Sequence, residues 1–295
     1  MNLRQLYLTK NECYHVYKKQ TPKRIMVHST GANNPWLSRY IAPDDGLIGK
    51  NLYDNDWNRY HPGGKDIGPH TFIKGPDGKC TKCGGVQKCV SAFIGKLNDG
   101  TVATIQTLPW DCVSWHSGVG DIGNVDFISF EICEDDHKSS EYFNIVYKEA
   151  VELCAYLCRK FNIAPDYPNI ICHSEGYKLG IASNHADVMH WFPKFGKSMD
   201  TFREDVKKQI EEEIMEEKWM EFINKLIDKT GKTEDEVIDA LAHLIKYANV
   251  KEDEWEKEGT DYLYKESKLI NTPRAANAPV HWGELGIVLK RLEKR

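Results

Sequence analysis

The stretch IICHSEGYKLGIASNHADVMHWF covers residues 170–192 and begins as an apolar, β-type run. It carries side chains suited to metal ligation: His173, His185, Asp187 and His190. A second run, RIMVHSTG at residues 24–31, ends its apolar part on His28. Histidines at the ends of strands point into the crevice where sheet proteins commonly bind ligands. One such histidine is more often structural, but two, with a carboxylate close behind the second, predict a zinc site.

Further apolar runs predict the rest of a sheet. The runs VSAFIGKL at 90–97 and TVATIQTL at 101–108 flank Asn-Asp-Gly, which favours a hairpin. FISFEIC at 127–133 is another β-rich run, and apolar residues recur at helical spacing between 147 and 161. We therefore expect an α/β fold with a mixed central sheet flanked by helices.

The bulk composition excludes several classes of protein. The formal net charge of −5 does not favour a nucleic-acid binder. No apolar run approaches the roughly 20 residues that span a bilayer, and the first residues lack a signal-peptide pattern. We therefore expect synthesis in the cytoplasm and no membrane insertion. The nine cysteines are scattered, and this pattern is typical of a reducing compartment rather than a disulfide framework.

The composition predicts two domains. Residues 1–211 form the first, and within it residues 33–89 are rich in Gly, Pro and Asp and indicate a long loop insertion rather than core elements. Charged helical sequence follows Asp200, a candidate N-cap, and a Thr233–Glu236 capping box starts another helix. Residues 212–295 are predicted to be a small helical C-terminal module.

Glu131 lies in the run at 127–133, whose alternation places it on one face with Ser129 and Cys133. A glutamate in this position fits a catalytic role. It fits equally well a charge on the solvated face of an antiparallel sheet.

A possible second, structural zinc site lies in the insertion. Cys80 and Cys83 form a Cys-x-x-Cys-Gly-Gly motif, Cys89 follows, and His70 is a candidate fourth ligand. Such an ion would order a long polar loop that has no core of its own. The alternative is a glycine-rich loop with free thiols.

Four motifs in order carry a family resemblance: MVHSTG, WHSG at 115–118, ISFEICED at 128–135, and CHSEG…NHAD…HWF. Together they resemble the zinc-dependent N-acetylmuramoyl-L-alanine amidases related to amidase-type phage lysozymes and peptidoglycan recognition proteins. The likeness is greatest to prophage-encoded endolysins of Gram-positive bacteria, and it covers roughly residues 6–206.

The resemblance implies a ligand set. His28 and His173 match the first two zinc ligands, and Asp187 matches the third. His185 stands where relatives often carry a catalytic lysine, and it would stabilise charge on the developing oxyanion. Asp200 and His190 remain alternatives for the third ligand; we favour Asp187 because a helix N-cap already explains Asp200.

The resemblance also implies a mechanism. Zinc would activate a water molecule and polarise the scissile carbonyl, while Glu131 acts as general base. The bond cleaved would be the amide between N-acetylmuramic acid and the L-alanine of the stem peptide. Trp115 and His116 match positions that line the substrate cleft. Relatives usually carry Tyr or His near residue 91, where this chain has Ser-Ala.

The implied partner is peptidoglycan, reached by release from the cell with the help of a holin-type protein during lysis or wall turnover. The C-terminal module would bind cell wall or mediate homodimerisation. Two other functions are compatible with the motifs: a non-catalytic peptidoglycan-binding module, and a zinc peptidase that cuts within the stem peptide. A complete ligand set with Glu131 favours the amidase over the binding module.

Overall fold

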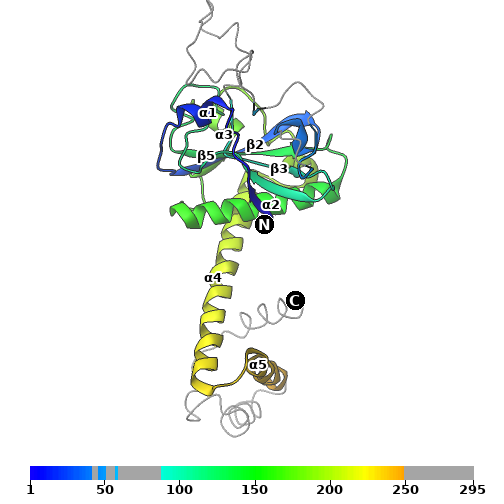
Figure 1. The fold of residues 1–295 in the computed structure, drawn as a ribbon, viewed down its shortest axis with the longest axis vertical. Coiled ribbons are helices and arrows are strands. Elements are labelled where there is room, and N and C mark those ends of the chain that lie inside the picture. The colour runs from blue at the N-terminus through cyan, green and yellow to red at the C-terminus, as the bar shows by residue number, and fades with distance from the viewer. Residues whose placement is uncertain (42–45, 51–56, 59–87, 249–295) are drawn as a thin grey trace, which may run out of the picture. The chain divides into compact units, whose positions relative to one another are not determined.

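The structure is a computed structural model that describes residues 1–41, 46–50, 57–58 and 88–248. Its centre is a six-stranded sheet with the order β1-β4-β3-β5-β2-β6 (Figure 1). The strands are β1 (Leu3–Gln5), β2 (Arg24–Asn33), β3 (Ala92–Lys96), β4 (Val102–Gln106), β5 (Phe127–Glu134) and β6 (Ile170–Cys172). All neighbours are parallel except the β3–β4 hairpin. The mixed sheet and the predicted hairpin are therefore confirmed.

The described helices are α1 (Glu12–Val16), α2 (Ser140–Phe161), α3 (His173–Lys178), α4 (Met199–Thr230) and α5 (Glu234–Ala248), with the 3-10 helices η1 (Leu37–Arg39) and η2 (Phe192–Phe195). Helix α2 lies across one face of the sheet (Figure 1). Ser139 caps its start by accepting from the Tyr142 backbone, and Asn162 ends it in the left-handed conformation. Its buried stripe packs on Ile94 and Phe130, so one hydrophobic core lies between helix and sheet.

The opposite face of the sheet carries a second core, which includes Phe93 and Ile105. Leu37 and Ile41, at the start of the segment 33–89, are fully buried in this core. The expectation that this segment contributes only loop is therefore wrong for its described part. The two side chains lie four residues apart around η1, so they reach the same apolar surface.

The strand ends differ from those expected. His28 does not end its strand, because β2 continues to Asn33 with an irregular register after Ser29. β6 ends at Cys172, and His173 is already the first residue of α3. Glu175 accepts from the Cys172 backbone at 3.1 Å, which stabilises the start of that helix.

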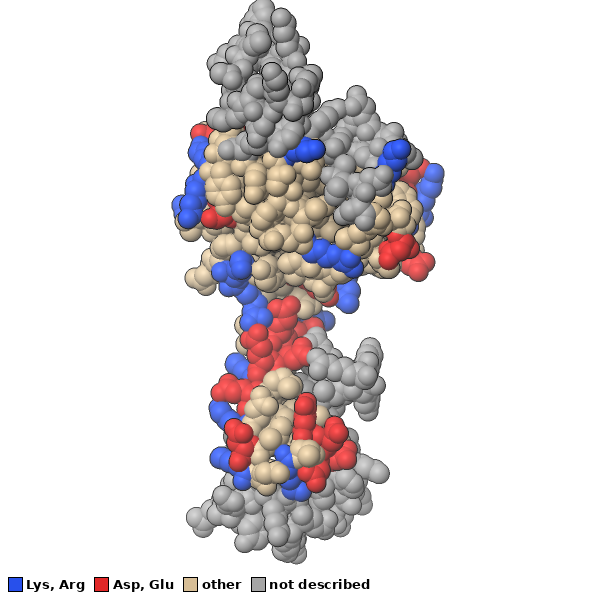
Figure 2. Space-filling view, in the orientation of Figure 1, with Lys and Arg blue, Asp and Glu red and all other residues tan. Residues whose placement is uncertain are grey.

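The chain divides into two compact units, residues 1–210 and 211–295. In the second unit, the described residues form the end of α4 and the whole of α5. These two segments share a small hydrophobic core of Ile223, Leu226, Val237, Ala240 and Leu241. The predicted Thr233–Glu236 capping box is present, with Glu236 Oε2 accepting from the Thr233 backbone at 2.8 Å. Acidic side chains gather on these helices in the face drawn in Figure 2. The described part of the chain contains no helix long and apolar enough to cross a bilayer.

Asp200 is not the N-cap of α4. The helix begins at Met199, and the Ser198 hydroxyl caps it by accepting from the Thr201 backbone at 3.1 Å. Asp200 instead lies in the first turn and accepts from Arg203 at 2.6 Å. The buried Arg203 guanidinium also donates to Glu175 and to the Ile170 carbonyl at 3.0–3.1 Å. This arginine therefore ties the start of α4 to β6 and α3.

We predict that Arg203→Ala lowers the free energy of unfolding by about 3 kcal/mol, because it leaves the partly buried Glu175 carboxylate without its charged partner. Asp200→Ala is the matched control and should change stability little, because the Asp200 side chain is 86% exposed. Urea unfolding followed by near-UV circular dichroism measures both. If Arg203→Ala and Asp200→Ala lowered the free energy of unfolding equally, the proposed role of Arg203 would be contradicted.

Candidate metal centre

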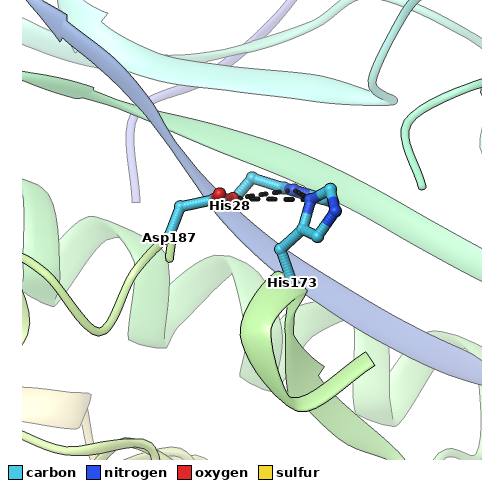
Figure 3. A group of neighbouring side chains, drawn as sticks. All are labelled: His28, His173 and Asp187. Carbon is cyan, nitrogen blue, oxygen red and sulfur yellow. Dashed lines mark hydrogen bonds and ion pairs between the residues drawn. The ribbon is translucent and has the colours of Figure 1, made fainter. Parts of the chain in front are cut away.

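The pairing of β2 with β6 brings His28 and His173 together. Val27 and Cys172 are partners in the parallel register, and each is followed directly by one of the histidines. Asp187 reaches the same point from the loop after α3. Figure 3 shows the three side chains converging from these separate segments. Both histidines are buried, and the Asp187 side chain is 13% exposed.

The ligand atoms have the spacing of a shared ion. His28 Nδ1 lies 3.0 Å from Asp187 Oδ2 and 3.0 Å from His173 Nδ1. The remaining pair, His173 Nδ1 and Asp187 Oδ2, is separated by 3.7 Å. A tetrahedral zinc with bonds of about 2.0–2.1 Å holds neighbouring ligand atoms about 3.3 Å apart. These residues therefore fit a zinc ion in their spacing and in their chemistry.

The outer nitrogens of the two histidines have partners that favour this arrangement. His28 Nε2 lies 2.9 Å from His116 Nδ1, and His173 Nε2 lies 3.2 Å from Ser183 Oγ. If each Nε2 donates its proton outward, both Nδ1 lone pairs face the shared point. Such outer hydrogen bonds orient metal-ligating histidines and fix their tautomer. Ser183 gave no signal in the sequence because its role depends on a contact across a loop.

The electrostatics supply the protonation states that metal binding needs. Burial, and then the nearby His28, lower the pKa of His173 to about 4. Burial also lowers the pKa of His116. Burial alone would raise the pKa of Asp187, but the hydrogen bond and charge of His28 outweigh it and lower that pKa. At neutral pH His173 therefore offers a neutral imidazole and Asp187 an ionised carboxylate.

Glu131 lies beside the group. It is directly opposite His28 in the parallel β5–β2 register, so the two side chains share one face of the sheet. Its Oε2 atom is buried and has no hydrogen-bond partner among the described residues. Burial, and then the charges of Asp187 and Glu134, raise the pKa of Glu131. Its environment is thus not a solvated surface, and a nearby cation would stabilise its ionised form.

The other residues expected at the site lie at different distances from it. His185 is exposed, and its Nδ1 is 2.9 Å from Ser183 Oγ and 3.3 Å from His173 Nε2. His116 contacts the His28 ring edge-on, with centroids 5.0 Å apart. Trp115 is half-buried against the core that includes Cys89. His116 therefore touches the ligand group directly, whereas the contact shown for Trp115 is with this core.

The alternative ligands lie elsewhere. Asp200 pairs with Arg203, and His190 belongs to a second group with Glu134. Cys80, Cys83 and His70 lie outside the described residues. Cys89 is a fully buried free thiol that donates to the Val90 carbonyl.

Comparison with known proteins shows the family of the chain. The profile of the N-acetylmuramoyl-L-alanine amidases matches residues 18–190, more than half of the chain. The chain belongs to this family, and its general activity is therefore that of a peptidoglycan amidase. A search of curated proteins gave no match.

Solved structures with similar folds include PlyL, with 18% identity and a TM-score of 0.42 over 70% of this chain and 96% of that one. The Staphylococcus aureus hydrolase AmiA, solved with its ligand, has 17% identity and a TM-score of 0.46 over 71% and 83%. A mutant endolysin from Bacillus subtilis has 19% identity and a TM-score of 0.42 over 70% and 99%. The family assignment rests on the sequence match.

We predict that Glu131→Gln stabilises the metal-free protein at pH 7–8 by about 1–3 kcal/mol, because it removes a carboxylate whose buried Oε2 has no hydrogen-bond partner among the described residues. The pKa of Glu131 is raised in the folded state, so ionisation of this side chain opposes folding. The folded protein therefore loses stability as the pH rises above 4.5, the pKa of glutamate in the unfolded chain. The difference in stability between Glu131→Gln and wild type should vanish near pH 4.5. Glu204→Gln, at an exposed position of α4, is the control for loss of one negative charge.

Thermal unfolding after removal of metal by a chelator, repeated across the pH range, measures the effect. A Glu131→Gln protein that is less stable than wild type at pH 8 would contradict the proposed environment.

Proposed function

We propose that this protein is a zinc-dependent amidase that cleaves the bond between N-acetylmuramic acid and the L-alanine of the peptidoglycan stem peptide. The observation that carries the proposal is the convergence of His28 Nδ1, His173 Nδ1 and Asp187 Oδ2 beside Glu131. Two imidazoles and one carboxylate are a ligand set of catalytic zinc sites, which keep a further position open. The family match supplies the substrate class.

Each residue has a distinct role in this proposal. Zinc, when bound, would polarise the scissile carbonyl and make water acidic enough to react at neutral pH. Glu131 accepts the proton of the attacking water and passes it to the leaving amine. Burial raises the pKa of Glu131 in the metal-free site, and this makes its carboxylate a stronger base for the first of these transfers.

His185 and His116 support the reaction in different ways. With Ser183 donating to its Nδ1, His185 carries its proton on Nε2 and donates to the developing oxyanion. Its exposed position leaves it accessible to substrate. His116 accepts from His28 Nε2 and so fixes the ring that presents Nδ1. Trp115 borders the proposed substrate cleft.

The remaining assignments extend the same proposal. Residues 1–211 are the catalytic domain, and residues 212–295 bind cell wall or pair two copies of the chain. The protein acts at the cell wall after release by a holin-type partner, as an endolysin of prophage type. The structural zinc at Cys80, Cys83 and Cys89 stays a prediction from the sequence.

The test is digestion of purified peptidoglycan followed by mass spectrometry. We expect wild type to release stem peptides with a free L-alanine amino terminus. Glu131→Ala should lower the rate by about 10²–10⁴-fold, the usual contribution of a general base. The variant should still bind one zinc at the group, because Glu131 is not a ligand. Glu204→Gln controls for the loss of charge.

Three outcomes would contradict the proposal. Products cut within the stem peptide would identify a zinc peptidase. Binding to peptidoglycan with no release by wild type would identify a non-catalytic binding module. A chelator that leaves the wild-type rate unchanged would remove zinc from the mechanism.

A further inference from the structure

A second group of metal-binding side chains lies outside the centre described above. Glu134 is at the end of β5, His137 follows in the next turn, and His190 comes from the loop before η2. The ligand atoms of these three residues all lie within 4.8 Å of one another. None of the three is part of the His28 group.

The carboxylate of Glu134 is at the centre of this group. The residue is 1% exposed, and each of its oxygens faces one imidazole. Oε2 lies 2.5 Å from His137 Nε2, and Oε1 lies 2.9 Å from His190 Nε2. Burial alone would raise the pKa of Glu134, but hydrogen bonds from His190, Ser29 and His137 outweigh it and lower the pKa. The group therefore holds a buried anion between two ring nitrogens.

The surroundings hold these side chains in place. The Gly31 backbone donates to Glu134 Oε1 at 2.9 Å, which orients the carboxylate. The His137 ring stacks on Trp191, with centroids 5.8 Å apart and an angle of 24° between the planes. The side chains of His137 and His190 are 15% and 30% exposed, so solvent reaches the group. A fixed carboxylate, two imidazoles and an open side are the requirements of a divalent-metal site.

Lys194 opposes a cation at this group. Its Nζ lies 2.5 Å from His137 Nδ1, and its side chain is exposed. A protonated lysine so close repels a metal ion, and it also competes by donating to the nitrogen that must carry a proton when Nε2 binds metal. An ion here is therefore bound more weakly than at the His28 group.

We infer that Glu134, His137 and His190 form a second divalent-metal site, distinct from the catalytic centre, which takes ions that favour imidazole and carboxylate such as Zn²⁺, Co²⁺ or Ni²⁺. Lys194 sets its low affinity. The inference does not depend on the proposed reaction, because it concerns binding by a separate set of side chains.

Occupancy of this site acts on the loop that carries the third catalytic ligand. His190 and Asp187 belong to one tight turn, in which the Met189 and His190 backbones donate to the Ala186 carbonyl at 2.7 and 3.2 Å. A metal that joins His190 to Glu134 therefore holds this turn against the end of β5.

The test is titration of the metal-free full chain with Co²⁺, followed by calorimetry and visible absorption. We expect one tight binding event at the His28 group and one weaker binding event at the Glu134 group. The weaker event should show no thiolate-to-cobalt absorption, which separates it from binding by cysteines. His137→Ala should remove the weaker event and keep the tight one. Asp187→Ala should weaken the tight event and keep the other.

Lys194→Gln leaves all three ligands in place and should strengthen the weaker event roughly twofold to fivefold, the effect of removing one exposed charge. Lys160→Gln, an exposed charge near the end of α2, is the matched control and should leave the affinity unchanged. A weaker event that persists in His137→Ala would overturn the inference. So would its absence from both wild type and Lys194→Gln, because the contacts around Glu134 would then be hydrogen bonds alone.

Discussion

The parallel pairing of β2 with β6 is the constraint on which the site depends. The register aligns Val27 with Cys172, so the next residue of each strand, His28 and His173, is delivered to the same place. A slip of one residue would turn one histidine to the opposite face of the sheet. Fully buried Ile25 and Ile170, partners in the same register, hold it by packing beneath α2. The core thus determines the geometry of the ligands.

The site stores unfavourable electrostatics that a bound cation relieves. Glu131 is ionisable and has a buried oxygen without a partner in the described part of the chain, and His173 is kept neutral by burial. The first condition costs stability in the metal-free protein, whereas the second costs little at neutral pH, because histidine is mostly neutral there in the unfolded chain as well. Both conditions suit the proposed reaction, since the first gives a stronger base and the second leaves a nitrogen lone pair for metal. The framework that tolerates this cost is the pair of cores on the two faces of the sheet.

The sequence predicted much of the sheet because apolar runs are local patterns. The grouping of His28, His173 and Asp187 was implied by the family resemblance, and the expectation that both histidines end strands was wrong. The sequence could not reveal Ser183, whose role arises only where its hydroxyl meets His173 across a loop. It also missed β1, three residues without alternation. Asp200 was predicted to be the N-cap because aspartate and serine are both common at that position. In the structure it is the Ser198 hydroxyl that accepts from the Thr201 backbone and caps the helix. The role of Ser183 and the pairing of β1 with β4 depend on contacts between segments that are separated along the chain, and local patterns carry no record of these contacts.

Anomalous diffraction at the zinc edge, from crystals of the full chain loaded with one equivalent of zinc, would locate the ion. We expect one strong peak at about 2.0–2.1 Å from His28 Nδ1, His173 Nδ1 and an Asp187 carboxylate oxygen, with Glu131 close by but not bound. A peak at Asp200, or a sole peak between Glu134 and His190, would contradict this expectation.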